Sequence, residues 1–146
     1  MNINKIHFIF GLSYDFNDKP FIYFHYLCLK SCYLIQKNCK IYIHYLYEPE
    51  NNVWWDKIKD FCNVVKYKSL PDIVYTCNGK KVWRIEHQSD IFRLLILKEQ
   101  GGVYADIDTL FYKQFPQTFF DKEFLIGTEY CYENGKKLYM SGLCNA

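Results

Sequence analysis

The sequence of 146 residues predicts an α/β fold in which helices flank a mainly parallel sheet. Short apolar runs of strand length alternate along the chain with segments whose apolar residues recur at helical spacing. This alternation is typical of βα units, which build parallel sheets between layers of helices. Half of the residues are hydrophobic and a fifth are aromatic, so we expect a globular chain with a real core rather than a disordered one.

The chain is expected to begin with a strand and a long helix. Residues 6–10 form an apolar run of strand length. Asp18 is a suitable cap for the following helix, and Pro20 suits its first turn, where a missing backbone N–H costs little. Apolar residues then recur at helical spacing as far as Lys37.

Two more strands and a short helix are expected before residue 70. Residues 40–47 continue as the second strand, with partly alternating side chains. A short helix opens at Asn51 or Asn52 and runs through Phe61. Residues 63–67 are the third strand.

The second half is expected to contain a loop, a long helix and three strands. Residues 70–82 include a proline and an Asn-Gly pair and are predicted to be a loop. The helix begins between residues 87 and 89 and runs to Gln100, because apolar residues recur at helical spacing and Gly101 suits a left-handed C-cap. The strands are expected at residues 103–107, 123–128 and 138–143.

Two aspartates, Asp106 and Asp108, stand where the strand at residues 103–107 ends. Residues two apart on a strand point to the same side, so both carboxylates are expected to project from one face. Two hard oxygen ligands at the carboxyl end of a strand suit Mg²⁺ or Mn²⁺ that also holds phosphate oxygens. The alternative is a capping or solvated pair, because Asp-x-Asp alone is a short motif.

Asp90 and Arg93 are three residues apart near the start of the long helix, so they are neighbours on one face. One interpretation is an intrahelical ion pair that contributes a few tenths of a kcal/mol. The other is an acid and a guanidinium held toward the metal site across the glycine turn. Their spacing alone does not separate these two interpretations.

Residues 89–108 resemble the signature of the retaining, DxD-containing glycosyltransferases of family 32. The Ser-Asp, Arg, Gly-Gly, Tyr and Asp-x-Asp elements occur in the same order and spacing. That family is known for initiating α-1,6-mannosyltransferases, α-1,4-galactosyltransferases and the glucosyltransferase domains of bacterial cytotoxins. Residues 5–11 are similar to the first strand of the family, where a terminal aromatic residue stacks on the nucleotide base.

The resemblance implies a GT-A-like three-layer sandwich and transfer of a hexose from a UDP- or GDP-hexose to a glycan, protein or lipid acceptor. Asp108 is expected to be a direct ligand of Mn²⁺ or Mg²⁺, and Asp106 a second ligand or a contact of the ribose or sugar. A bound cation would offset the negative charge that develops on the leaving diphosphate. The residues expected to bind the donor sugar or nucleotide are Phe10, Ser89, Asp90, Arg93 and Tyr104.

Relatives in this family continue well beyond the Asp-x-Asp motif, so residues 1–146 are expected to form one nucleotide-sugar-binding domain that is truncated at its C-terminal end. A second chain could supply the missing part. The competing hypothesis is a non-catalytic remnant that binds a nucleotide, a cation or a partner only. A Mg²⁺-dependent phosphohydrolase or nuclease is a third hypothesis, but it would need further acidic ligands.

Composition excludes several other classes of function. The net charge of +2 is too small to favour nucleic acid. The seven cysteines contain no Cys-x-x-Cys pair, which argues against a zinc site or a disulfide framework. We find no signal peptide and no membrane-spanning stretch, so a cytoplasmic protein is expected.

Other histidines and tryptophans are interpreted mainly as core residues. His25, His44 and His87 lie within apolar stretches and are expected to be packed inside. Trp54 and Trp55 could form a carbohydrate platform, although one of two adjacent helical residues is normally buried.

Overall fold

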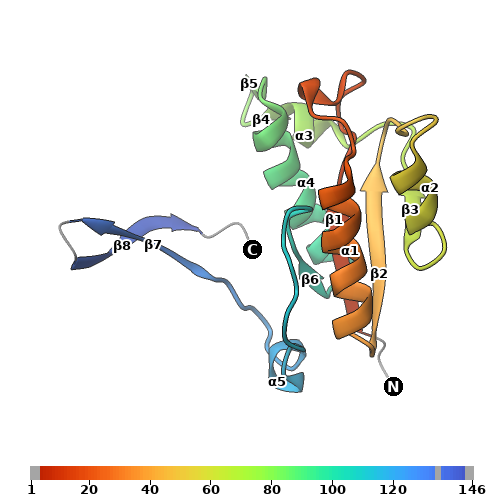
Figure 1. Ribbon diagram of the computed structural model, residues 1–146. Helices are drawn as coiled ribbons and strands as arrows, with labels where there is room; N and C mark the ends of the chain where they lie inside the picture. Colours follow the sequence, from red (N-terminus) through yellow and green to blue (C-terminus); the bar gives the residue numbers. More distant parts are fainter. Residues whose placement is uncertain (1–3, 134–135, 144–146) are drawn as a thin grey trace.

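The computed structural model describes residues 4–133 and 136–143 of the chain. Its centre is a four-stranded parallel sheet with the strand order β3-β2-β1-β6 (Figure 1). The four strands are β1 (Asn4–Ile9), β2 (Cys39–Tyr45), β3 (Asn63–Lys66) and β6 (Val103–Tyr104). The predicted α/β class and the mainly parallel sheet are confirmed.

In the described part of the chain, the remaining elements are two long helices, four short helices and two antiparallel hairpins. The helices are η1 (Phe16–Asp18), α1 (Tyr23–Ile35), α2 (Val53–Ile58), α3 (Asp72–Tyr75), α4 (Ile85–Gln100) and α5 (Gln117–Phe120). The hairpins are β4 (Thr76–Cys77) with β5 (Lys80–Lys81), and β7 (Thr128–Glu133) with β8 (Lys136–Leu143). Figure 1 shows the β7-β8 hairpin extending away from the sheet. Within the described residues, no helix is long and apolar enough to cross a membrane.

The sheet separates two hydrophobic cores, because successive side chains of a strand point to opposite faces. Ile6 and Phe8 of β1 are fully buried on the face covered by α1 and α2, where Trp55 of α2 is also fully buried. Ile9 belongs to the opposite core, with Phe92 of α4. Helices therefore cover both faces, as expected of a three-layer sandwich.

The strand order places a topological switch point between β1 and β6. From β1 the chain passes through α1 to β2 and then to β3 on one side, and α4 returns it to β6 on the other side of β1. Ligands of such sheets bind in the crevice at the carboxyl ends of the strands that flank the switch point. The residues that follow β1 and β6 therefore meet at one edge of the sheet.

The glycine pair between α4 and β6 allows β6 to lie directly against β1. Gly101 and Gly102 have φ angles of 64° and 95°, which side-chain-bearing residues rarely adopt. A Cβ atom on Gly102 would lie 2.6 Å from the Lys5 carbonyl oxygen. The Lys5 ammonium donates a hydrogen bond of 3.1 Å to the Gln100 carbonyl on the other side of the turn. Only a residue without a side chain fits at position 102.

A chain of hydrogen bonds joins the glycine turn to β1, β2 and the residue after β3. His7 Nε2 lies 3.0 Å from the Gly101 carbonyl oxygen, His7 Nδ1 lies 3.0 Å from His44 Nε2, and His44 Nδ1 lies 3.1 Å from the Tyr67 hydroxyl. A carbonyl can only accept, so His7 Nε2 donates to it. Because burial lowers the pKa of both histidines to about 4, each neutral ring carries one proton. His44 Nε2 therefore donates to His7, and the Tyr67 hydroxyl donates to His44.

Both long helices differ from their predicted starts. α1 begins at Tyr23, because Asp18 ends the η1 turn with a φ of 57° and cannot lead into a right-handed helix. Pro20 consequently lies before α1 instead of in its first turn. α4 begins at Ile85, ahead of the predicted start between residues 87 and 89. Ile85 packs against the core that contains Ile9 and Phe92, which extends the helix toward its N-terminus.

Three predictions for the extended segments need correction. The strand expected at residues 103–107 is paired only over Val103–Tyr104, and the chain then turns, with the Thr109 N–H donating to the Asp106 carbonyl at 3.0 Å. Residues 123–127 are not a strand, and pairing begins at Thr128. The expected loop at residues 70–82 contains α3 and the β4-β5 hairpin, whose turn residues Asn78 and Gly79 both have positive φ. Asn-Gly in a two-residue turn is a strong hairpin signal, and it was available in the sequence.

We expect protonation of His7 and His44 to destabilise the fold in acid. Their folded pKa of about 4 lies below the ordinary value of 6.5, so between these values the unfolded chain binds protons that the folded chain excludes. Their contribution to the free energy of unfolding is therefore full above pH 6.5 and is lost as the pH falls toward 4.

The measurement is an NMR titration of the imidazole carbons, paired with urea unfolding at each pH. A His87→Gln variant identifies the signal of an exposed histidine and serves as a control for the unfolding profile. Titration of His7 and His44 in the folded protein near pH 6.5 would contradict the hydrogen-bond assignment.

Candidate functional site

A cleft of about 410 Å³ opens at the carboxyl ends of β1 and β6. The segment after β1, the first half of α4 and the turn after β6 form its walls. All residues predicted to bind donor or metal line this one cleft, namely Phe10, Ser89, Asp90, Arg93, Tyr104, Asp106 and Asp108. They come from segments that are far apart in the sequence, and the switch point of the sheet brings them together.

Arg93 joins the helix wall of the cleft to the strand wall. Its Nη2 lies 2.6 Å from Asp90 Oδ1, and its Nη1 lies 3.5 Å from Asp106 Oδ1. The guanidinium carbon also lies 4.4 Å from the centre of the Tyr104 ring, a cation–π contact. The side chain is only 14% exposed, so these charges interact in a partly desolvated environment. The intrahelical pair is confirmed, and Arg93 in addition contacts the Asp-x-Asp motif through Asp106.

Asp106 is held by a tyrosine and the arginine, yet its environment is short of positive charge. The Tyr104 hydroxyl donates a hydrogen bond of 2.9 Å to Asp106 Oδ1, and Ser89 hydrogen-bonds to Tyr104 in turn. Burial raises the pKa of Asp106, and the carboxylates of Asp108 and Asp90 raise it further against the opposing effects of Tyr104 and Arg93. A cation at this position would relieve that crowding of negative charge.

Asp108 lies in the turn after β6 and is exposed. The expectation that a strand aligns both carboxylates on one face is wrong, because pairing has already ended at Tyr104. Both aspartates nevertheless line the cleft. Asp108 also faces α1, since its charge raises the pKa of His25 against the stronger lowering caused by burial.

The donor set of the cleft fits a hard divalent cation only in part. Asp106 and Asp108 offer carboxylate oxygens, the ligand type preferred by Mg²⁺ and Mn²⁺. Among the residues that the structure describes, no group of three or more His, Cys, Asp or Glu side chains could hold a metal ion. A cation held by two aspartates would complete its coordination with water and ligand oxygens, which is usual for Mg²⁺.

Phe10 lies at the cleft wall, but its ring is not an open platform. It stacks on Phe16 with a centroid distance of 5.6 Å and an interplanar angle of 16°, and it packs edge-on against Phe21 at 5.2 Å. Phe16 and His25 also line the cleft. Nothing in the sequence indicated these two residues, because both depend on how the segment between β1 and α1 folds back.

The histidines and tryptophans differ partly from their predicted places. His44 is fully buried as expected, His25 is partly buried in the cleft wall, and His87 is exposed, so its assignment to the core is wrong. Trp55 is fully buried in the core, while Trp54 is partly exposed and packs against Tyr23 with a centroid distance of 4.5 Å. The two tryptophans therefore do not form a shared platform.

Four of the cysteines are unsuited to nucleophilic chemistry. Cys28, Cys32, Cys39 and Cys62 are free thiols. Burial raises the pKa of Cys28 to about 11 and that of Cys62 to about 12, so the reactive thiolate is scarce at neutral pH. None of these four cysteines lines the cleft, whose ionisable lining residues are Lys19, His25, Glu86, Asp90, Arg93, Tyr104, Asp106 and Asp108.

Comparison with known proteins supports the resemblance seen in the sequence. Residues 25–125 match the family described as "Glycosyltransferase sugar-binding region containing DXD motif". The chain is 31% identical over 147 aligned residues to Glucan organizing enzyme 1 of Cryptococcus neoformans var. grubii, an alignment that covers 98% of this chain and 38% of that protein.

Two further similarities are more limited in extent. Cytotoxin-L of Paraclostridium sordellii is 37% identical over 68 residues, which cover 45% of this chain and 3% of the toxin. The solved structure titled "PaToxG Glycosyltransferase" is similar with a TM-score of 0.47 and 20% identity, over 77% of this chain and 45% of that one. The chain thus spans less than half the length of each of these relatives.

We expect Tyr104→Phe to raise the pKa of Asp106 further. The tyrosine hydroxyl donates to the ionised carboxylate and thereby lowers its pKa, so removing that oxygen favours the protonated form. Titration of the Asp106 carboxyl carbon by NMR measures the change. Tyr112→Phe, at a position that is 89% exposed, is the matched control. An unchanged or lower pKa in Tyr104→Phe would show that the hydrogen bond is not formed in solution.

Proposed function

This chain belongs to the family of glycosyltransferases with a DXD-containing sugar-binding region, and on that basis we propose that it transfers a hexose from a nucleotide sugar to an acceptor. The donor would be a UDP- or GDP-hexose, and the acceptor a glycan, protein or lipid. One observation carries the proposal. The seven residues predicted to bind donor or metal line a single cleft at the switch point of the sheet, where nucleotide ligands of parallel sheets bind.

In the proposed reaction, the bond between the anomeric carbon and the diphosphate oxygen breaks. A bond forms between that carbon and an acceptor hydroxyl oxygen, the hydroxyl proton is released, and the nucleoside diphosphate leaves as an anion. Asp106 and Asp108 would hold Mn²⁺ or Mg²⁺, which as a Lewis acid supplies positive charge where the leaving diphosphate gains negative charge.

The protein's own side chains have distinct proposed tasks. Asp90 and Arg93 would bind hydroxyl groups of the donor sugar, since Asp90 is 46% exposed beside a guanidinium that is held in place on two sides. Tyr104 and Ser89 would line the sugar pocket and orient the Asp106 carboxylate. A preformed arrangement of this kind lowers the cost of ordering side chains when the donor binds.

Phe10 is the proposed contact of the nucleotide base, although another aromatic ring already covers part of it. Phe16 already stacks on its ring, so an entering base would either displace Phe16 or stack on the Phe10–Phe16 pair. Phe16 has a φ of 53°, a conformation that is uncommon for a bulky residue. Movement of the η1 segment would relieve that conformation.

A second candidate is binding of nucleotide and cation without turnover. The chain spans 38% of the length of its fungal relative, so elements that exclude water from the cleft could come from outside these residues, including from a second chain. Product analysis after long incubation with UDP- and GDP-hexoses and Mn²⁺ tests for turnover, and any released hexose would exclude this second candidate. We expect donor binding with slow hydrolysis or none from the 146 residues alone, because an open cleft weakens electrostatic stabilisation.

We expect Mn²⁺ together with a nucleoside diphosphate to raise the melting temperature, since a ligand that binds the folded state stabilises it. Asp108→Asn should remove the metal-dependent part of that increase and leave the melting temperature without ligand nearly unchanged, because Asp108 is exposed in a turn. Asp60→Asn, at an exposed position outside the cleft, is the control. A metal-dependent increase that survives in Asp108→Asn would remove this residue from the proposed metal site.

Arg93→Ala should weaken binding of the nucleotide sugar much more than binding of the bare nucleoside diphosphate. Loss of a partly buried, charged hydrogen-bond donor to the sugar would cost roughly 2–4 kcal/mol. Isothermal titration calorimetry with each ligand gives the two affinities. The melting temperature of the ligand-free variant reports how much stability is lost with the Asp90 and Asp106 contacts. Equal weakening of the two ligands would assign Arg93 to the diphosphate or to the fold alone.

A further inference from the structure

A second concavity adjoins the donor cleft along the first turns of α4. It has a volume of about 590 Å³, and Asp90 lines both spaces. Its other wall is the β4-β5 hairpin and the segment that leads into α4. The polar and aromatic side chains around it are those of Lys80, Lys81, Trp83, Arg84 and His87.

The charge of this concavity is positive. Lys80, Lys81 and Arg84 each add a positive charge, and the one carboxylate among its lining residues, Asp90, is already paired with Arg93 at 2.6 Å. A negatively charged ligand is therefore favoured over a neutral or positively charged one.

Trp83 gives the concavity an apolar surface. Its side chain is 74% exposed, which is unusual for so large an aromatic residue. Lys81 Nζ lies 3.7 Å from the centre of its ring, a cation–π contact that keeps a charge and an aromatic surface together. Exposed aromatic residues beside a concave site are typical of ligand-binding surfaces.

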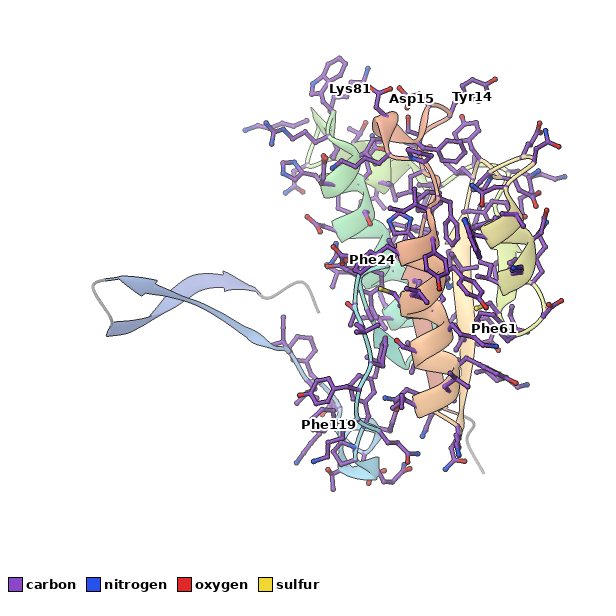
Figure 2. The ribbon with its side chains drawn as sticks, in the orientation of Figure 1. Tyr14, Asp15, Phe24, Phe61, Lys81 and Phe119 are labelled. Carbon is purple, nitrogen blue, oxygen red and sulfur yellow. The ribbon has the colours of Figure 1, made fainter. Side chains whose placement is uncertain are left out.

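The backbone that carries these side chains is hydrogen-bonded to α3 and to α4. The two-residue turn at Asn78 and Gly79 closes the hairpin, and the Val82 N–H donates to the Tyr75 carbonyl at 2.8 Å. Gln88 of α4 is buried, and its side-chain amide donates a hydrogen bond of 2.9 Å to the Val82 carbonyl. Tyr14 and Asp15 belong to the segment that follows β1. In Figure 2, Lys81 lies at the same end of the molecule as these two residues. The concavity thus opens at the end of the sheet where the donor cleft lies.

We propose that this concavity is an acceptor subsite that binds a sugar bearing a negative charge, such as a phosphorylated sugar or a uronic acid. That this sugar would be an acceptor rests on the proposed glycosyltransferase function. The shared residue Asp90 would place such a sugar beside the donor hexose. Lys81 and Arg84 would bind the anionic group, and Trp83 would pack against the sugar ring. This assignment names an acceptor class, which the family membership leaves open.

The test measures binding of glucose 6-phosphate to the 146-residue chain without donor or metal, by calorimetry and by quenching of tryptophan fluorescence. Glucose tests the need for charge, and inorganic phosphate tests the need for a sugar. We expect glucose 6-phosphate to bind about tenfold more tightly than either, a difference of about 1.4 kcal/mol. Equal binding of inorganic phosphate would overturn the sugar subsite, and equal binding of glucose would overturn the anionic one.

Variants assign the binding to named residues. Trp83→Ala and Lys81→Ala should each weaken binding of glucose 6-phosphate about fivefold or more, a loss of about 1 kcal/mol, while Trp83→Phe and Lys81→Arg should keep most of it. Lys98→Ala, at an exposed lysine in the last turn of α4, is the control and should change nothing. Unchanged binding in Trp83→Ala and Lys81→Ala would overturn the assignment.

Two further measurements separate this proposal from the proposed function. A UDP- or GDP-hexose with Mn²⁺ should bind together with glucose 6-phosphate, and displacement of one ligand by the other would overturn a separate subsite. Asp108→Asn should leave binding of glucose 6-phosphate intact, so failure of the donor site does not conceal the result. A short oligonucleotide that binds through the same residues more tightly than glucose 6-phosphate would instead assign the surface to nucleic acid and overturn the proposal.

Discussion

The close approach of the glycine pair to β1 is the constraint on which the site depends. Gly102 has room for no side chain beside the Lys5 carbonyl, and this contact lets β6 pair with β1 immediately after α4 ends. Because α4 and β6 are joined by only two residues, the first half of α4 and the turn after β6 must face each other across the same edge of the sheet. Arg93 can then reach Asp106 from the helix.

The electrostatics of the cleft follow from this geometry. Asp90, Asp106 and Asp108 gather around one guanidinium, and burial of Asp106 makes the imbalance costly in the absence of a positively charged ligand. The Tyr104 hydroxyl donates a hydrogen bond to the carboxylate without adding charge. The cleft is therefore an arrangement of fixed dipoles and carboxylates that favours a cation over an anion near Asp106 and Asp108. The adjoining concavity beside Trp83 has the opposite preference.

Hydrophobic periodicity predicted the parallel sheet, because it is a local signal. The residues expected to bind the donor were predicted from the resemblance of residues 89–108 and 5–11 to a known family. The sequence could not predict how the segment between β1 and α1 folds, so Phe16 and His25 were missed. The error at Asp18 came from the same segment, where positive φ angles override the preference of aspartate for a helix cap. The prediction that Asp106 and Asp108 lie together at this edge of the sheet used a wrong premise, since the turn after β6, rather than strand alternation, presents Asp108 to the cleft.

The buried hydrogen-bond chain from Tyr67 through His44 and His7 ends at the Gly101 carbonyl, and that ending determines what the chain can transport. A Grotthuss relay needs a last atom that can take up a proton and then release another. A peptide oxygen does not do so at ordinary pH, so a proton entering at Tyr67 has no exit. The direction of all three hydrogen bonds is fixed by the carbonyl, and neither imidazole can reverse its tautomer alone. The two histidines therefore conduct no protons, and they act as a rigid polar connection between the sheet and the glycine turn.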